Sequence, residues 1–234
     1  MTKPGNKTIL VAIDTAPTSK YILREALVLA SSTRSQVVLT SITPQYEGNM
    51  NRFLLDDAER EFAEPFQQVL RDGEAYAHSL GVQIETVSRV GKPCQEIIAI
   101  AEEIKASLIV LGCIKRNQVE RMLLGRTSAE VIANSPCDVM LIPEDAEIRF
   151  RKLLVGINGT STGEMAVYRA IEIAESYGSK IHGLYAIDLP PNRSMLYAVR
   201  QNAEQKARDS LMPFKKITQE HEIPAVTVTM FAPP

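Results

Sequence analysis

The sequence predicts an α/β protein, in which a parallel sheet has helices on both faces and a partial second copy of the same unit follows. Residues 7–42 and 151–186 align without a gap at an offset of 144 residues, each with the pattern strand, turn, helix, strand. A segment that occurs twice in one chain is a folding unit. Short aliphatic runs alternate with helical periods, which is typical of parallel strands covered on both faces. Right-handed crossovers then place helices on both sides of the sheet.

The strands of the first copy are expected at its aliphatic runs. Four runs are short and nearly continuous, as in buried parallel strands; they are Ile9–Ile13, Val37–Ile42, Leu108–Leu111 and Val139–Ile142. Residues 84–90 alternate between apolar and polar side chains instead, which predicts a strand at a sheet edge. The first copy therefore supplies five strands.

The segments between these runs have helical periods. The first helix is expected to begin after Thr18 or Ser19 as N-cap, with one apolar face made of Ile22, Ala26, Leu29 and Ala30. Residues 54–80 are also helical in period, but Pro65 and Gly73 predict a kink or two separate helices. Pro93 marks the start of the next helix, whose apolar face holds Ile97, Ile98, Ala101 and Ile104.

A polar, acidic linker at Pro143–Arg149 divides the chain, which predicts a complete domain over residues 1–147 and a partial one over 148–234. The first copy continues into a glycine-bearing loop at residues 112–128, and the second ends before a counterpart of that loop. Its strand at residues 153–157 would then lie at a sheet edge, where unpaired backbone groups favour association. We expect a homodimer or pairing of the two domains within one chain, unless residue 234 is not the natural end and a longer protein supplies the missing strands.

Composition excludes several classes of function. The chain has 234 residues, 45% hydrophobic and 23% charged, with a formal net charge of -2. These values are ordinary for a soluble globular protein without a nucleic-acid partner. The three cysteines have no CxxC spacing and the three histidines no metal-ligand pattern, so a reduced cytoplasmic compartment is expected. The apolar run at Ile9–Ile13 is too short for a signal sequence or a membrane span.

The ends of the predicted strands carry the candidate site. Ligands of such sheets bind beyond the carboxyl ends of the strands, where the strand order reverses. The residues that leave these ends are Asp14, Ile42 and Gly112. Residues 125–128 precede a further helix, where free backbone N–H groups and hydroxyls can hold an anion.

Three segments of the first copy resemble the universal stress protein family in its tandem form, with the second copy incomplete. They are ILVAID followed by a helix, GKPCQEIIAIAEEIKASLIVLG, and LLGRTSAEVIANSPCDVMLIP. The resemblance covers residues 7–143, and the first third of the unit recurs from residue 151. It implies a five-stranded sheet of order 3-2-1-4-5 and no required catalytic activity. In one branch of the family it also implies a bound adenine nucleotide, ATP, ADP or AMP.

For that branch the resemblance implies that a glycine pattern binds the nucleotide: Gly, two residues, Gly, nine residues, Gly, then Ser or Thr. Here Gly112 and Gly125 match, whereas Lys115 replaces the second glycine and Arg126 replaces the hydroxyl residue. The side chain at 115 can close the space that a triphosphate needs. The two cations can instead pair with phosphate oxygens. Both interpretations stay open at this stage.

The resemblance assigns further positions to the nucleotide. It implies that Asp14 contacts the nucleoside and that the backbone at Ile42 faces the adenine. The candidate nucleotide-binding residues are therefore Ala12, Asp14, Ile42, Gly112, Lys115, Gly125, Arg126, Thr127 and Ser128. Seven of them have a structural alternative: Asp14 as the cap of a turn, the glycines as turn residues, the two cations as surface charges, and the two hydroxyl residues as helix N-caps.

The second copy is weaker as a site. Asn158 stands where Asp14 stands in the first copy, and residues 159–162 form a polar turn that either caps the helix or accepts a small anion. The protein is thus expected to be a non-enzymatic, cytoplasmic stress-response protein that binds ATP or another adenine nucleotide, with the need for Mg²⁺ left open. The alternatives are a module that binds an unknown protein partner without nucleotide, and a slow ATPase. The absence of a GxxxxGK[ST] motif disfavours the ATPase.

Overall fold

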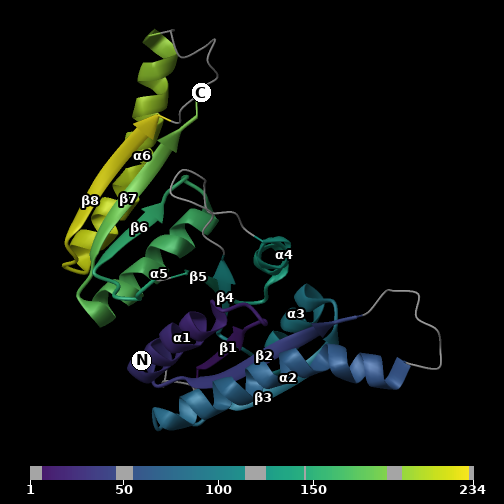
Figure 1. The fold of residues 1–234 in the computed structure, drawn as a ribbon. Coiled ribbons are helices and arrows are strands. Elements are labelled where there is room, and N and C mark those ends of the chain that lie inside the picture. Colours follow the sequence, from purple (N-terminus) through teal and green to yellow (C-terminus); the bar gives the residue numbers. More distant parts are fainter. Residues whose placement is uncertain (1–6, 46–54, 114–124, 145, 189–196, 232–234) are drawn as a thin grey trace. The chain divides into compact units, whose positions relative to one another are not determined.

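The computed structural model describes residues 7–45, 55–113, 125–144, 146–188 and 197–231. The chain divides into two compact units, Met1–Ile148 and Arg149–Pro234. Figure 1 shows the elements of both units. That these units are the two domains expected from the linker remains a proposal.

The first unit is a five-stranded parallel sheet of order β3-β2-β1-β4-β5, which confirms the expected fold. The edge strands are β3 and β5, and the alternating segment is β3, so its expected position at a sheet edge is confirmed. The elements of this unit are β1 Thr8–Ala12, α1 Ser19–Thr33, β2 Gln36–Pro44, α2 Leu55–Ser79, β3 Glu85–Gly91, α3 Pro93–Glu103, β4 Leu108–Cys113, α4 Arg126–Asn134 and β5 Asp138–Pro143.

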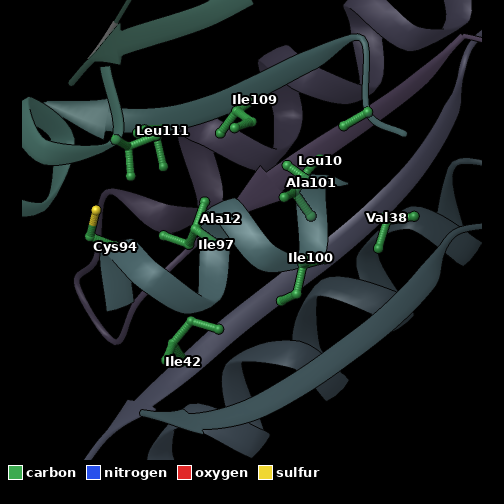
Figure 2. Close-up of a cluster of buried hydrophobic side chains, with 12 residues drawn as sticks. Leu10, Ala12, Val38, Ile42, Cys94, Ile97, Ile100, Ala101, Ile109 and Leu111 are labelled. Atoms are coloured by element: carbon green, nitrogen blue, oxygen red, sulfur yellow. The ribbon is translucent and has the colours of Figure 1, made fainter. Parts of the chain in front are cut away.

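Helices cover both faces of this sheet. On one face, α3 and α4 pack on strand side chains in a single apolar cluster, part of which Figure 2 shows. That cluster holds Leu10, Val38 and Ile109 from three neighbouring strands together with Ile97 and Ile100 from α3. The opposite face packs against α1 and α2, which also contact each other. The alternation of side chains along each strand thus supplies two separate cores.

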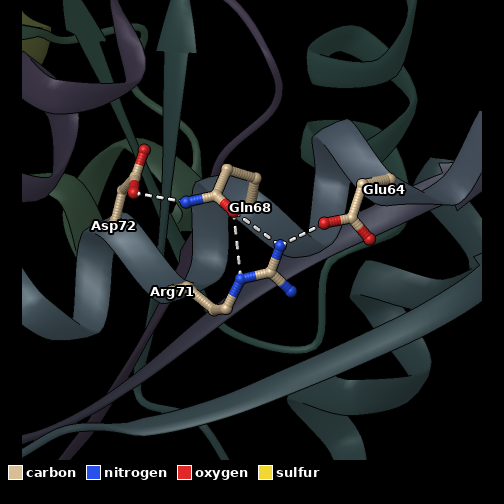
Figure 3. Close-up of polar contacts among 4 residues, drawn as sticks. All are labelled: Glu64, Gln68, Arg71 and Asp72. Carbon is tan, nitrogen blue, oxygen red and sulfur yellow. Dashed lines mark hydrogen bonds and ion pairs between the residues drawn. The ribbon is translucent and has the colours of Figure 1, made fainter.

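Helix α2 is one continuous helix, so the expectation of two pieces is wrong. Gly73 packs closely on the sheet, since a β-carbon at this position would lie 2.5 Å from Leu39 Cδ2. The missing side chain lets α2 approach the sheet, and this packing compensates for the low helix propensity of glycine. Side-chain bonds along the exposed surface (Figure 3) support the helix past Pro65. Arg71 donates to Glu64 at 2.5 Å and to Gln68 at 2.6 Å, and Gln68 Nε2 donates to Asp72 at 2.7 Å.

The second unit is a three-stranded parallel sheet of order β6-β7-β8. Its elements are β6 Lys152–Gly156, α5 Ser161–Tyr177, β7 Lys180–Ile187, α6 Tyr197–Glu220 and β8 Ala225–Phe231. Both helices pack on one face, where Val155 and Ile181 lie with Phe214 in the apolar core of the second unit. The expected edge position of β6 is confirmed.

The two units share backbone geometry as well as sequence pattern. Helices α1 and α5 both end in a left-handed residue, Arg34 with φ 53° and Gly178 with φ 64°. In both cases the N–H of this residue bonds to a carbonyl in the last turn of its helix, as in the common left-handed helix end. The N–H of Ile13 bonds to Thr40 O at 2.9 Å, and that of its counterpart Ile157 bonds to Leu184 O at 2.8 Å. The repeat is therefore structural.

The repeat extends into the next helix, which the sequence comparison above does not include. Helix α2 corresponds to α6 at an offset of 141 residues, because the turns after them repeat: the N–H of Val82 bonds to Ala77 O, and that of Ile223 bonds to Thr218 O. The sequence pattern of residues 68–72, with Gln, Arg and Asp, recurs at residues 205–209, one turn nearer the start of its helix. The side-chain bonds return too, because Gln205 Nε2 donates to Asp209 at 2.9 Å and Arg208 Nε donates to Gln205 at 3.2 Å. At the offset of 141 residues that the turns define, α2 and α6 can be compared residue by residue.

Candidate functional site

The candidate site lies at the carboxyl ends of β1 and β4, where the strand order of the first sheet reverses, as is usual in doubly wound sheets. Val11 pairs with Val110, so Asp14 and Gly112 leave the sheet next to each other. The Ser128 hydroxyl, in the first turn of α4, donates to Gly112 O at 3.3 Å. The fold therefore brings together the end of β1, the end of β4 and the start of α4.

Asp14 forms the turn that leads from β1 into α1. Its Oδ1 accepts from the N–H of Ala16 at 2.9 Å and from the Ser19 hydroxyl at 3.1 Å. The Ser19 hydroxyl also lies 2.7 Å from the Asp14 carbonyl oxygen. Asp14 is exposed, and its second carboxylate oxygen has no hydrogen bond to another described residue. The turn interpretation is thus correct, and it leaves one oxygen available to a ligand.

The second unit forms the same turn without a negative charge. Asn158 Oδ1 accepts from the N–H of Thr160 at 3.1 Å, two residues later, as Asp14 Oδ1 does from Ala16. The Thr160 side chain accepts from the N–H of Gly163 at 3.3 Å and so caps α5. This confirms the capping alternative for the segment. Because asparagine suffices for the turn, the charge of Asp14 is not explained by the turn.

The two glycines of the pattern have different surroundings. A β-carbon on Gly112 would lie 2.4 Å from Ile22 Cδ1, so packing against α1 accounts for this glycine. Gly125 has φ -61° and ψ 154°, values that any residue adopts, and apart from its chain neighbours no described residue has an atom within 4 Å of its ideal β-carbon position. Neither backbone conformation nor packing among the described residues requires glycine at position 125.

We predict that Gly112→Ala destabilises the folded protein by about 1–3 kcal/mol, because the new methyl group overpacks a buried contact with Ile22. The matched change Gly125→Ala should cost less than about 1 kcal/mol, since it meets no neighbour and only replaces one N-cap residue by a poorer one. Urea unfolding of both variants measures the difference. Equal losses of stability would contradict the packing account of Gly112.

The start of α4 presents backbone donors beyond the end of β4. Its first helical bond runs from the N–H of Ala129 to Gly125 O at 3.0 Å, so the N–H groups of residues 126–128 have no partner within the helix. Gly125 at the N-cap has no side chain to occupy them. Such a helix end favours an anion. Thr127 is half-buried and Ser128 is buried.

Arg126 lies along α4 in the structure. Its side chain is 92% exposed, and Nε donates to Glu130, one turn further on, at 2.9 Å. The hydrogen bond to Glu130 raises the pKa of the Arg126 guanidinium above its usual range. Sequence reasoning missed Glu130, although its spacing of four residues from an arginine was a visible signal. Lys115 lies outside the described residues.

The two other described candidates, Ile42 and Ala12, have buried side chains. Ile42 is 6% exposed and its side chain packs with Ile97 of α3, as Figure 2 shows. Ala12 belongs to the same cluster. Their side chains are therefore core residues, and only the main chain at these positions can face a ligand.

A hollow of about 450 Å³ between α3 and α4 lies next to this site without belonging to it. It is lined by Cys94, Glu102 and Glu130, among others. Burial raises the pKa of the Cys94 thiol, and the nearby Glu130 carboxylate adds to this effect, because both disfavour the thiolate. The thiol therefore stays protonated at neutral pH, which makes it a poor nucleophile.

Two further properties concern metals and membranes. Among the described residues, no three His, Cys, Asp or Glu side chains come together in a way that would hold a metal ion. In the part of the chain that the structure describes, no helix has both the length and the apolar character needed to cross a bilayer.

The fold and the position of the candidate site define a doubly wound α/β protein built as a tandem repeat, with its candidate site at the switch point of the first sheet. The chain belongs to the universal stress protein family, whose sequence profile matches residues 5–143 and 149–232. The resemblance seen in the sequence is thereby confirmed.

Individual relatives agree with this assignment. A universal stress protein of Mycobacterium tuberculosis is 26% identical over 139 residues, which are 58% of this chain and 95% of that protein. One of Methanocaldococcus jannaschii is 38% identical over 76 residues, covering 32% of this chain and 45% of that protein. The crystal structure of a universal stress protein from Archaeoglobus fulgidus matches 98% of this chain and 80% of its own, with a TM-score of 0.72 at 16% identity. This last match shows the shared fold.

Proposed function

We propose that the first unit binds an adenine nucleotide, ATP, ADP or AMP, and that the protein acts in a cytoplasmic stress response without catalysing a reaction. The observation that carries the proposal is the uncapped start of α4, which presents the N–H groups of residues 126–128 at the same sheet edge as the open carboxylate oxygen of Asp14. Phosphates fit the helix end and hydroxyls of the ribose fit the carboxylate. The backbone near Ile42 would face the base.

Titration calorimetry of the full chain with ATP and with ADP tests this proposal, with and without Mg²⁺. We expect at most one site per chain, because only the first unit combines the turn at Asp14 with a helix start of this kind among the described residues. Two equivalent sites per chain would contradict it. Asp14 alone carries a carboxylate among the described candidate residues, so any Mg²⁺ would be held mainly by phosphate oxygens.

The second unit supplies a matched pair of variants. Asp14→Asn keeps the turn, as Asn158 shows, and removes the charge that we assign to the nucleoside. It should weaken binding at least tenfold, about 1.4 kcal/mol, with unchanged stability. Asn158→Asp should leave nucleotide binding unchanged. Unaltered affinity of Asp14→Asn would remove the side chain from the site.

A protein-binding module without nucleotide is the alternative. It predicts that the purified protein carries no small molecule absorbing in the ultraviolet band of adenine and shows no heat of binding with any of the three nucleotides. A slow ATPase, the third candidate, would release phosphate from ATP under the same conditions. Both outcomes would replace the proposal.

We further propose that the edge of β6 is covered in solution, by a second copy of the chain or by the first unit. β6 is an edge strand and its Leu154 is 69% exposed. Unpaired backbone and apolar surface therefore occur together, and both favour association. Light scattering distinguishes a dimer from intrachain pairing. A stable monomer in which the amides of Leu153–Ile157 exchange rapidly with solvent would contradict both forms of the proposal.

A further inference from the structure

A second hollow, of about 260 Å³, lies wholly within the second unit. It is bounded by the end of β6, the first turns of α5 and the middle of α6. Its floor is apolar and contains Ile157, Val167 and Phe214, which are all buried. Its rim is polar and contains Thr160, Glu164 and Asp209. An apolar floor with a few polar groups at the mouth is the usual composition of a small-molecule site.

The hollow corresponds to a smaller side chain in the second copy. Val167 stands where the first unit has Leu23, in the alignment of residues 151–186 with 7–42. Leu23 is 2% exposed, so its position is one that a larger side chain fills.

Phe214 stands where the first unit has Gly73, when α2 and α6 are aligned by the turns that follow them, and it does not refill this space. A β-carbon on Gly183 would lie 2.7 Å from its ring, so the ring packs against the glycine of β7. Gly183 in turn replaces Leu39 of the first unit. The aromatic ring therefore takes the volume of the lost leucine, and the space at Val167 and Pro213 stays open.

The charge at the rim also changes between the copies. Glu164 replaces Lys20, and Asp209 stands where the first unit has Gln68, so both changes make the rim more negative. Neither rim carboxylate forms an ion pair with another described residue, and Asp209 has its hydrogen bond from Gln205. Glu164 lies in the first turn of α5 and also stabilises that helix, but Asp209 has no such role. The hollow thus combines apolar walls with two negative charges.

An anion does not fit this mouth. The Thr160 hydroxyl donates to Asn158 Oδ1 at 2.7 Å and accepts from the N–H of Gly163, so it is used within the turn. The two carboxylates would repel a negative charge. The alternative of a small anion at residues 159–162 is therefore disfavoured.

We propose that this hollow binds a small organic cation, a primary amine attached to a short alkyl or aryl group. The apolar part would lie on Val167 and Phe214, and the ammonium group would meet Glu164 and Asp209. A volume below the usual range of about 300–1,000 Å³ restricts the ligand to a small molecule. This site is independent of the nucleotide site, because all of its lining residues belong to the second unit.

Titration of the ¹⁵N-labelled full chain, followed by NMR, tests the proposal with three probes of similar shape. We expect phenethylamine to shift the amides of Gly159 and Gly163 with an affinity at least fivefold higher than 2-phenylethanol. Phenylacetate should cause no shift there. Equal binding of the amine and the alcohol, or no binding of the amine at millimolar concentration, would overturn the proposal.

Variants that reverse the charge of the rim or fill the hollow sharpen the test. Glu164→Lys should abolish amine binding, and Val167→Leu combined with Pro213→Tyr should fill the hollow and abolish binding of amine and alcohol alike. If the filled variant fails to fold, the isosteric surface changes Glu164→Gln and Asp209→Asn replace it, and together they should lower amine affinity at least fivefold. Lys20→Glu in the first unit is the control and should change nothing. Undiminished amine binding in the variants of Glu164 and Asp209 would refute the assignment.

Discussion

Replacing Lys115 and Arg126 together with alanine is expected to weaken ATP binding at least tenfold. A charged contact to a phosphate oxygen contributes about 1.5–3 kcal/mol. Exposure of the Arg126 side chain reduces its share through solvent screening. Titration calorimetry at two salt concentrations measures the change. Added salt should weaken binding by the unmodified protein more than binding by the double variant, since screening acts on the contacts that the variant lacks.

Two further variants decide whether these cations help or obstruct. Glu130→Ala releases Arg126 from its partner at 2.9 Å, so ATP should bind more tightly if Arg126 reaches the phosphates. Lys115→Gly combined with Arg126→Ser restores the residue types of the family pattern and should weaken binding in the same way as alanine. Tighter binding by this second variant would show that the side chains obstruct the site, and the expectation would be wrong.

The strands could be predicted from sequence because burial on both faces leaves a direct signal. The run at Ile9–Ile13 became β1, Thr8–Ala12, and the alternating segment became the edge strand β3. Helix α2 was predicted less well, because Pro65 and Gly73 are helix breakers only when nothing compensates. Close packing of Gly73 on Leu39 requires a contact between distant segments, which local propensity does not contain.

The candidate site was predictable in its backbone and not in its side chains. The spacing of Gly112 and Gly125 correctly indicated a strand end next to a helix start. The sequence could not show that Gly112 is required by Ile22, nor that Arg126 lies beside Glu130, because both depend on rotamers and packing. Comparison of the two units clarifies the role of one side chain. Asn158 forms the same turn as Asp14 without a negative charge, so the turn does not require the charge of Asp14.

One buried charge escaped the sequence analysis altogether. Glu25 follows Ile22 by three residues and precedes Leu29 by four, so it interrupts the apolar face of α1. An ionised residue on such a face is uncommon unless it is paired. Its side chain is 6% exposed, with Oε1 bonded to Arg24 Nε at 2.8 Å and Oε2 accepting from the N–H of Ile148 at 2.7 Å. It therefore attaches the last residue of the first unit to α1.

Glu25→Ala is accordingly expected to destabilise the protein by about 2–3 kcal/mol, because it leaves a cavity and removes the acceptor of a partly buried N–H group. Urea unfolding measures the loss, and hydrogen exchange should show faster exchange of the Ile148 amide. Glu25→Gln keeps an acceptor oxygen and should cost less, while Arg24→Ala, which removes the partly exposed partner, tests the ion pair alone. The Ile148 amide loses its acceptor in Glu25→Ala, so its exchange should become faster than in the unmodified protein. An unchanged rate would show that the carboxylate does not hold the end of the first unit.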